Sequence, residues 1–283
     1  MVLTHPAIVV LIAIGVWWLS TGLVLAVVHR SETGGSRPAR LMIDMTGAGF
    51  AGFALMLFGS DMDTAFGSYV GFFGALLVWA WHEAAFLTGM LTGSRKSDCP
   101  PGLSGFARFR AAWQALCDHE IAILLTVIVL WFALSGNVNP FGFATFLLLW
   151  LMRISAKLLI FLGAPHAVSD LMPRRIAYLK TYFNTGRTTP FFPIFLAGAI
   201  GLFAILVIGA NRAAEDHSVV GHTLLATFMA LAIIEHLILV LPITDTALWR
   251  WAVTRPGQQK AAATVRHDDI ARLGLGAKNR LDN

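Results

Sequence analysis

The chain has 283 residues, of which 57% are hydrophobic and only 13% are charged, and its formal net charge is +5 at pH 7. Soluble domains carry about 25% charged residues. This composition therefore excludes an ordinary soluble enzyme, a disordered chain and a secreted disulfide-bonded scaffold. An all-α, polytopic membrane protein is expected instead.

Seven stretches of the chain are apolar over the roughly 20 residues that a helix needs to cross a bilayer. In chain order, spanning helices are expected near residues 6–28, 41–59, 68–92, 119–136, 141–163, 191–210 and 219–243. Glycines recur within them, among them Gly47, Gly49 and Gly52, as is typical where membrane helices pack closely. We therefore expect one bundle of about seven transmembrane helices over residues 1–252, followed by a polar cytoplasmic tail over residues 253–283.

The basic residues indicate how this bundle lies in its membrane. If the N-terminus is outside, 20 of the 21 Lys and Arg residues fall on the inner side, and Arg212 alone falls outside. The short outer loops instead carry Asp61, Asp63, Glu215 and Asp216. Because positive residues concentrate on the cytoplasmic side, we expect the N-terminus out and the C-terminus in. The net charge of +5 then reflects topology, so no nucleic acid is expected as a partner.

The segment near residues 103–118 has the pattern of an amphipathic helix. Its large apolar residues Phe106, Phe109, Trp113 and Leu116 recur at spacings of three and four, and Arg108 lies among them. Such a helix lies in the plane of the membrane surface. The topology above puts this surface helix on the cytoplasmic side.

Ionisable side chains, which are energetically unfavourable inside a membrane, are concentrated in the cytoplasmic half of the expected bundle. An ionisable side chain at the bilayer centre costs roughly 2.5–3.5 kcal/mol on insertion scales, so its presence there points to a function. Three of the five glutamates adjoin a histidine, and a further histidine closes the fifth expected span. The residues that four helices are expected to bring to this depth are His82, Glu83, His119, Glu120, His166, Glu235 and His236.

Three functions fit this cluster. All seven residues are candidate metal ligands, and a carboxylate–histidine di-iron centre draws such ligands from several helices of a bundle, although no Glu-x-x-His motif is present. The four histidines, His82, His119, His166 and His236, are also candidate cofactor ligands for a tetrapyrrole, either haem or bacteriochlorophyll. The third function is a proton or ion relay through the carboxylates.

A purely structural interpretation is equally open. The polar groups would then neutralise one another across helices, with Arg153 and Lys157 as the partners of Glu83 and Glu235.

At several motifs the chain resembles the PuhE-type photosynthetic complex assembly proteins of purple phototrophic bacteria. These motifs are Trp79-x-Trp81-His82-Glu83, Gly163-Ala164-Pro165-His166, Tyr182-Phe183-Asn184-Thr185-Gly186-Arg187, Thr189-Pro190-Phe191-Phe192-Pro193 and Glu235-His236. The resemblance runs over essentially the whole membrane region. It implies a role in making or assembling the photosynthetic apparatus, with an influence on bacteriochlorophyll production, and it implies no catalytic residues.

Residues and resemblance together lead to one expected function. We expect a multi-pass protein of the bacterial inner (intracytoplasmic) membrane that assists assembly of the reaction centre and light-harvesting apparatus and modulates bacteriochlorophyll supply. Its expected partners are the lipid bilayer and either reaction-centre or light-harvesting subunits or pigment-synthesis enzymes. The alternative is a membrane-bound di-iron oxidoreductase acting on a bacteriochlorophyll or carotenoid precursor.

Overall fold

The computed structural model describes residues 2–33, 38–167, 171–242 and 251–252. These residues form α-helices and short 3-10 helices and contain no strand. The α-helices are α1 (Pro6–Thr33), α2 (Pro38–Ser60), α3 (Ala65–Leu87), α4 (Gly105–Leu134), α5 (Phe141–Leu162), α6 (Phe192–Arg212) and α7 (Asp216–Ile238). The 3-10 helices are η1 (Val2–Thr4) and η2 (Arg174–Tyr182). Seven helices are long and apolar enough to cross a membrane, which confirms the predicted number.

Local chemistry explains where several helices begin and end. The helices α1 and α2 begin at Pro6 and Pro38, because a proline at the first helical position lacks only an N–H that would have no partner there. Helix α3 ends at Leu87 rather than near residue 92 as predicted. The Thr88 hydroxyl donates to the Ala84 carbonyl oxygen (2.8 Å), and Gly89 then takes a φ of +72°. A glycine in this left-handed conformation ends a helix readily.

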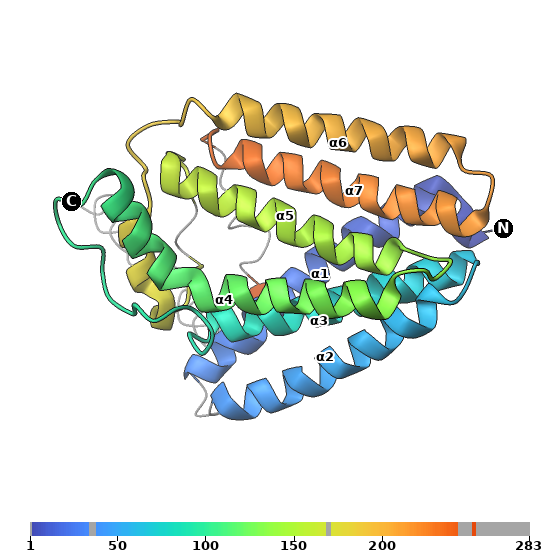
Figure 1. Cartoon of the computed structure of the whole chain (residues 1–283), viewed down its shortest axis with the longest axis horizontal. Helices are drawn as coiled ribbons and strands as arrows, with labels where there is room; N and C mark the ends of the chain where they lie inside the picture. Colours follow the sequence, from blue (N-terminus) through green and yellow to red (C-terminus); the bar gives the residue numbers. More distant parts are fainter. Residues whose placement is uncertain (1, 34–37, 168–170, 243–250, 253–283) are drawn as a thin grey trace, which may run out of the picture.

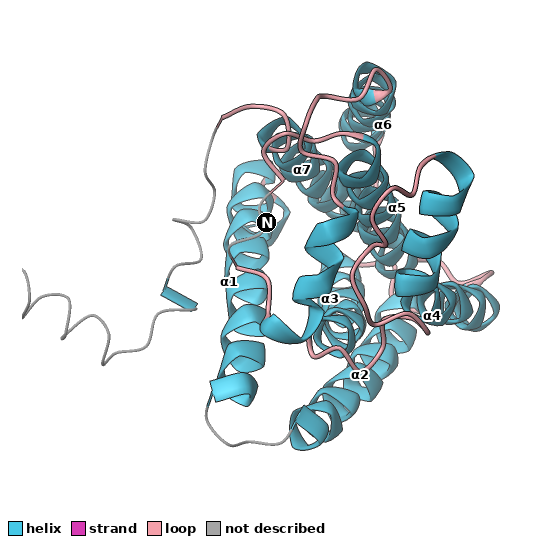
Figure 2. Ribbon diagram, turned by 90° about the vertical axis from the view of Figure 1, so that its left-hand side faces the viewer, coloured by secondary structure: helices cyan, strands magenta, loops and turns pink. Residues whose placement is uncertain are grey.

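Helix α4 joins two segments that the sequence analysis treats separately, the surface helix near 103–118 and the span near 119–136. It runs unbroken for 30 residues, because neither proline nor glycine follows Gly105 within it. Its length of about 45 Å exceeds the roughly 30 Å of a hydrocarbon core. Its first part turns away from the remainder and lies across one end of the bundle, beside η2 (Figures 1 and 2). The surface position of this first part stays a prediction.

The centre of the bundle is formed by α3 and α7. Of their most apolar windows, 61% and 56% of the residues are buried, compared with 11% for α6 at the edge of the bundle. Helices α2 and α3 approach most closely where glycines face each other. A Cβ atom on Gly52 would lie 2.6 Å from the carbonyl oxygen of Gly74, so only glycine fits there.

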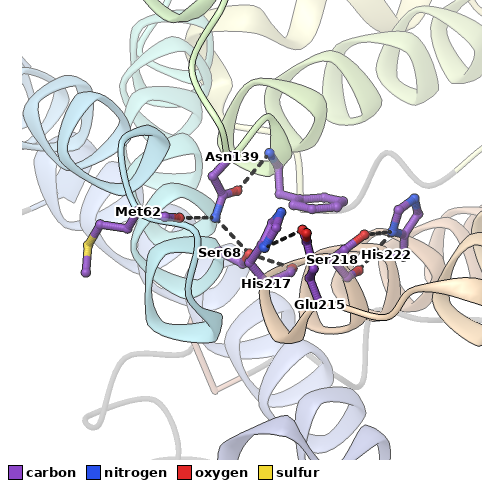
Figure 3. A network of polar contacts seen from close by, with 8 residues as sticks. Met62, Ser68, Asn139, Glu215, His217, Ser218 and His222 are labelled. Carbon is purple, nitrogen blue, oxygen red and sulfur yellow. Dashed lines mark hydrogen bonds and ion pairs between the residues drawn. The ribbon is translucent and has the colours of Figure 1, made fainter.

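A polar network ties the loops together at the end of the bundle opposite η2 (Figure 3). The Asn139 amide donates to the carbonyl oxygen of Met62 and to the hydroxyl oxygen of Ser68, both at 3.0 Å. The Ser68 hydroxyl donates in turn to the carbonyl oxygen of His217 at 2.7 Å. The His217 ring lies 3.5 Å from the Glu215 carboxylate. These hydrogen bonds fix the loops before α3 and α5 and the start of α7 relative to one another.

Some predictions lie beyond these observations. The tail over residues 253–283 and the end of the last expected span lie outside the described residues. The direction of the bundle in its membrane stays a prediction from the distribution of charge.

Candidate functional site

Two ion pairs join α5 to its neighbours within the membrane-spanning region. Arg153 and Lys157 are four residues apart on α5, so they lie on one face of the helix. The Arg153 guanidinium donates to the Glu83 carboxylate of α3 at 2.9 Å, and the Lys157 ammonium donates to Glu120 of α4 at 2.5 Å. The structural interpretation predicts Arg153 and Lys157 as partners of Glu83 and Glu235. Arg153 does pair with Glu83, whereas the carboxylate paired with Lys157 is Glu120.

Tryptophans complete the hydrogen bonding of two glutamates. The Trp150 indole donates to the second oxygen of Glu120 at 3.3 Å, and the Trp17 indole of α1 donates to Glu235 of α7 at 3.1 Å. Glu235 and Glu120 also lie close enough to Arg153 to attract its charge. Glu83 and Glu120 thus pair with the two cations of α5, whereas Glu235 is bonded to Trp17.

The histidines of α3 and α4 are buried next to this charged group. His82 and His119 are 1% and 0% exposed, and their ring centres lie 6.3 Å apart. The Thr126 hydroxyl donates to a backbone carbonyl, so it accepts from His82 Nε2 (3.0 Å). His82 Nδ1 and both ring nitrogens of His119 have no hydrogen-bond partner among the described residues. The His119 ring packs against Phe86 at 4.6 Å.

The remaining two predicted histidines have different surroundings. His236 is buried, and its Nδ1 donates to the Ala232 carbonyl oxygen at 2.7 Å. Its Nε2 therefore accepts from the Ser155 hydroxyl of α5. His166 is exposed, and its backbone N–H donates to the Leu239 carbonyl oxygen at 3.0 Å.

The predicted ligands thus contact different protein groups and, in the part of the chain that the structure describes, do not face one common point. Within residues 2–33, 38–167, 171–242 and 251–252, no three His, Cys, Asp or Glu side chains lie close enough together to hold one metal ion. The metal and tetrapyrrole roles of His82, Glu83, His119, Glu120, His166, Glu235 and His236 stay predictions.

A cavity of about 470 Å³ adjoins the ion pairs, between α4, α5 and the segment that carries η2. Its charged wall is formed by Glu120, Arg153 and Lys157. The rest of its lining is apolar or aromatic, and includes Phe86, Phe109, Trp113, Trp150, Phe161, Tyr182 and Phe183. The Arg153 side chain keeps 41% of its surface exposed although it belongs to the middle of α5. An apolar cavity with a few convergent polar groups is the usual form of a small-molecule site.

Beside the cavity, Arg108 links the first part of α4 to the end of α5 and to the end of η2. Its guanidinium donates to the carbonyl oxygens of Phe161 (3.2 Å) and Tyr182 (2.7 Å) and stacks over the Phe161 ring at 4.3 Å. Apart from Phe86 of α3, the buried residues of this region come from the first part of α4 and from η2. We call these two packed segments the roof of the cavity, because Ala112, Leu179 and Tyr182 line it.

A second cavity, of about 360 Å³, lies on the other side of α4, between α2 and α3. His82, Thr126 and Thr46 are among its lining residues, and apolar side chains form most of the rest. His82 thus lines the second cavity, while the first is lined by Phe86, whose ring packs against His119.

Three residues that were not predicted bond to predicted site residues, namely Trp150, Thr126 and Ser155. A usable signal existed for Trp150, because it precedes Arg153 by three residues and Lys157 by seven, which places all three on one helical face. No comparable signal marks Thr126 or Ser155, since hydroxyl residues commonly bond to their own helix backbone.

Comparisons with known proteins extend over nearly the whole chain. The chain is 32% identical over 276 residues to a protein of Rhodobacter capsulatus named "Uncharacterized 30.4 kDa protein in puhA 5'region". The match covers 97% of this chain and 100% of that protein. No solved structure matches. The family model "Protein of unknown function (DUF3623)" matches residues 3–260. The chain, with its seven helices long and apolar enough to cross a membrane, therefore belongs to the DUF3623 family.

Proposed function

We propose that this protein is an inner-membrane factor that assists assembly of the photosynthetic reaction centre and light-harvesting apparatus and modulates bacteriochlorophyll supply. In this proposal the cavity between α4 and α5 holds a pigment or a pigment precursor. The basic segments at the η2 end of the bundle bind the partner subunits or pigment-synthesis enzymes.

The context of the relative supports the biological part of the proposal. Its printed name places it in the 5′ region of puhA in Rhodobacter capsulatus. The motifs around His82, His166 and Glu235 also resemble assembly proteins of purple phototrophic bacteria. Both point to the photosynthetic apparatus as the setting in which the protein acts.

The observation that carries the molecular part is the aromatic cavity with a charged wall. Its volume of about 470 Å³ lies within the 300–1,000 Å³ typical of ligand pockets. Aromatic walls suit a flat ring system, because rings stack on one another. The charged wall lies inside a spanning bundle, where ionisable groups are costly and are kept for a function.

The test is a complementation experiment in Rhodobacter capsulatus that lacks the gene of the relative. The wild-type chain is expected to restore the bacteriochlorophyll absorption of the membranes. Ala156 lines the cavity, so Ala156→Phe is expected to fill it and to lower pigment content. Leu151 is 54% exposed on the same helix and does not line the cavity, so Leu151→Phe is the matched control.

Two results would overturn this function. The first is a wild-type chain that reaches the membrane and leaves the pigment content of the deletion strain unchanged. The second is an Ala156→Phe protein that accumulates normally and restores as much pigment as Leu151→Phe does.

A further inference from the structure

The cavity between α4 and α5 offers hydrogen-bond donors rather than acceptors. Glu120 is the one carboxylate among its described lining residues, and its two oxygens already accept from Lys157 and Trp150. An ammonium has three N–H donors and a guanidinium has five. Arg153 Nε is buried and has no partner among the described residues. The N–H groups of Arg153 and Lys157 that have no acceptor within the described part of the chain could therefore donate to an acceptor atom of a ligand.

The charge of the network determines which acceptor fits. Arg153 and Lys157 are each already paired with a carboxylate, Glu83 and Glu120, so the two ion pairs together carry no net charge. A ligand carboxylate would add a negative charge that these two pairs leave unbalanced, and it would lie near the carboxylates of Glu83 and Glu120. Repulsion between like charges is strong where water is scarce. An uncharged acceptor, such as a ketone or ester carbonyl, meets no such repulsion.

We propose that this cavity binds an uncharged, largely apolar ring molecule whose carbonyl oxygen accepts hydrogen bonds from Arg153 and Lys157. The aromatic lining contacts the ring, and the two cations hold the carbonyl at the charged wall. The proposed function supplies one part of this inference, namely that the ring is a pigment. A quinone presents the same chemistry, an apolar ring with carbonyl oxygens.

Binding to the purified full chain in detergent tests the proposal. Trp113 and Trp150 line the cavity, so quenching of tryptophan fluorescence reports its occupation. Three probes are compared: pheophorbide a methyl ester, which is uncharged, pheophorbide a, which has the same ring with a free carboxylate, and decylubiquinone, an uncharged quinone. The methyl ester is expected to bind about tenfold more tightly than the acid, since one unfavourable charge contact at this scale corresponds to about that ratio.

A double variant tests the role of the donors. Lys157→Met with Glu120→Gln removes one donor cation and one carboxylate together, so no charge is left without its partner and the remaining pair of Arg153 and Glu83 is still neutral. It is expected to bind the methyl ester about tenfold more weakly, because a hydrogen bond from a charged donor is lost. Leu151→Phe is expected to bind it as the wild type does.

The outcomes separate this inference from the proposed function. Equal or tighter binding of the acid would overturn the uncharged carbonyl and leave the pigment function standing. Binding of decylubiquinone without binding of either pheophorbide would support the uncharged carbonyl and overturn the pigment. If none of the three probes binds, or if the double variant binds the methyl ester like the wild type, the inference is wrong.

Discussion

Removal of the Lys157 ammonium alone should lower the free energy of unfolding more than removal of both partners of its ion pair with Glu120. The Nζ–Oε1 distance to Glu120 is 2.5 Å, and the two side chains are only 17% and 11% exposed. Lys157→Met leaves the Glu120 carboxylate inside the bundle without its cation. Breaking a buried pair in this way typically costs about 3–5 kcal/mol, whereas replacing both partners is often neutral.

The lower end of that range, about 3 kcal/mol, is expected for Lys157→Met, because Glu120 keeps its hydrogen bond from Trp150. Lys157→Met with Glu120→Gln should lie within about 1 kcal/mol of the wild type. The assay is reversible unfolding in mixed micelles of lipid and detergent, followed by circular dichroism. The free energy of unfolding is compared for the wild type, the single variant and the double variant.

Equal stability of the single and double variants would refute this reasoning. It would mean that the Glu120 carboxylate is tolerated in the bundle without the Lys157 ammonium, and that their ion pair does not contribute to the free energy of unfolding.

Three further predictions concern packing, the roof of the cavity and topology. Gly52→Ala should lower the free energy of unfolding by about 2 kcal/mol, measured in the same assay, because its new Cβ would overpack against α3. The control is Gly47→Ala, whose new Cβ has no atom within 4 Å, and it should leave the free energy of unfolding unchanged or raise it. Arg108→Ala should loosen η2 and speed proteolysis between residues 174 and 182, because the hydrogen bonds to Phe161 and Tyr182 are lost. The exposed control Arg110→Ala should not. Equal digestion rates of the two variants would contradict the role of Arg108 in holding η2. A cysteine placed at Asp61 in a chain with both native cysteines replaced should react with a membrane-impermeant maleimide in intact spheroplasts, and labelling confined to inside-out vesicles would reverse the predicted orientation.

The number and approximate position of the helices follow from the sequence, because hydrophobic length alone largely determines what crosses a bilayer. The ends follow less well. Helix α3 stops five residues before the predicted limit of 92, since Thr88 and Gly89 end it while the apolar character of the chain continues. Helix α4 extends across the boundary predicted near residue 118, because no helix-breaking residue separates its polar part from its apolar part.

The candidate site could be predicted in part. The cost of ionisable groups in a membrane drew attention to Glu83, Glu120 and Glu235, and of the partners predicted for Glu83 and Glu235 the structure shows the pair of Arg153 and Glu83. The pairing of Lys157 with Glu120 depends on how α4 and α5 are placed relative to one another, and a single sequence carries no information on that distance. For the same reason, the cavity between α4 and α5 could not be predicted from the sequence.

The central claim is that the cavity between α4 and α5 holds a pigment, and the absorption spectrum of the purified protein tests it most directly. Chain expressed in a phototrophic host and purified in mild detergent should carry tetrapyrrole absorption bands. The Ala156→Phe protein, purified in parallel, should carry much weaker bands, and the Leu151→Phe protein should match the wild type. A folded wild-type protein without such bands, or an Ala156→Phe protein with bands of full intensity, would contradict the claim.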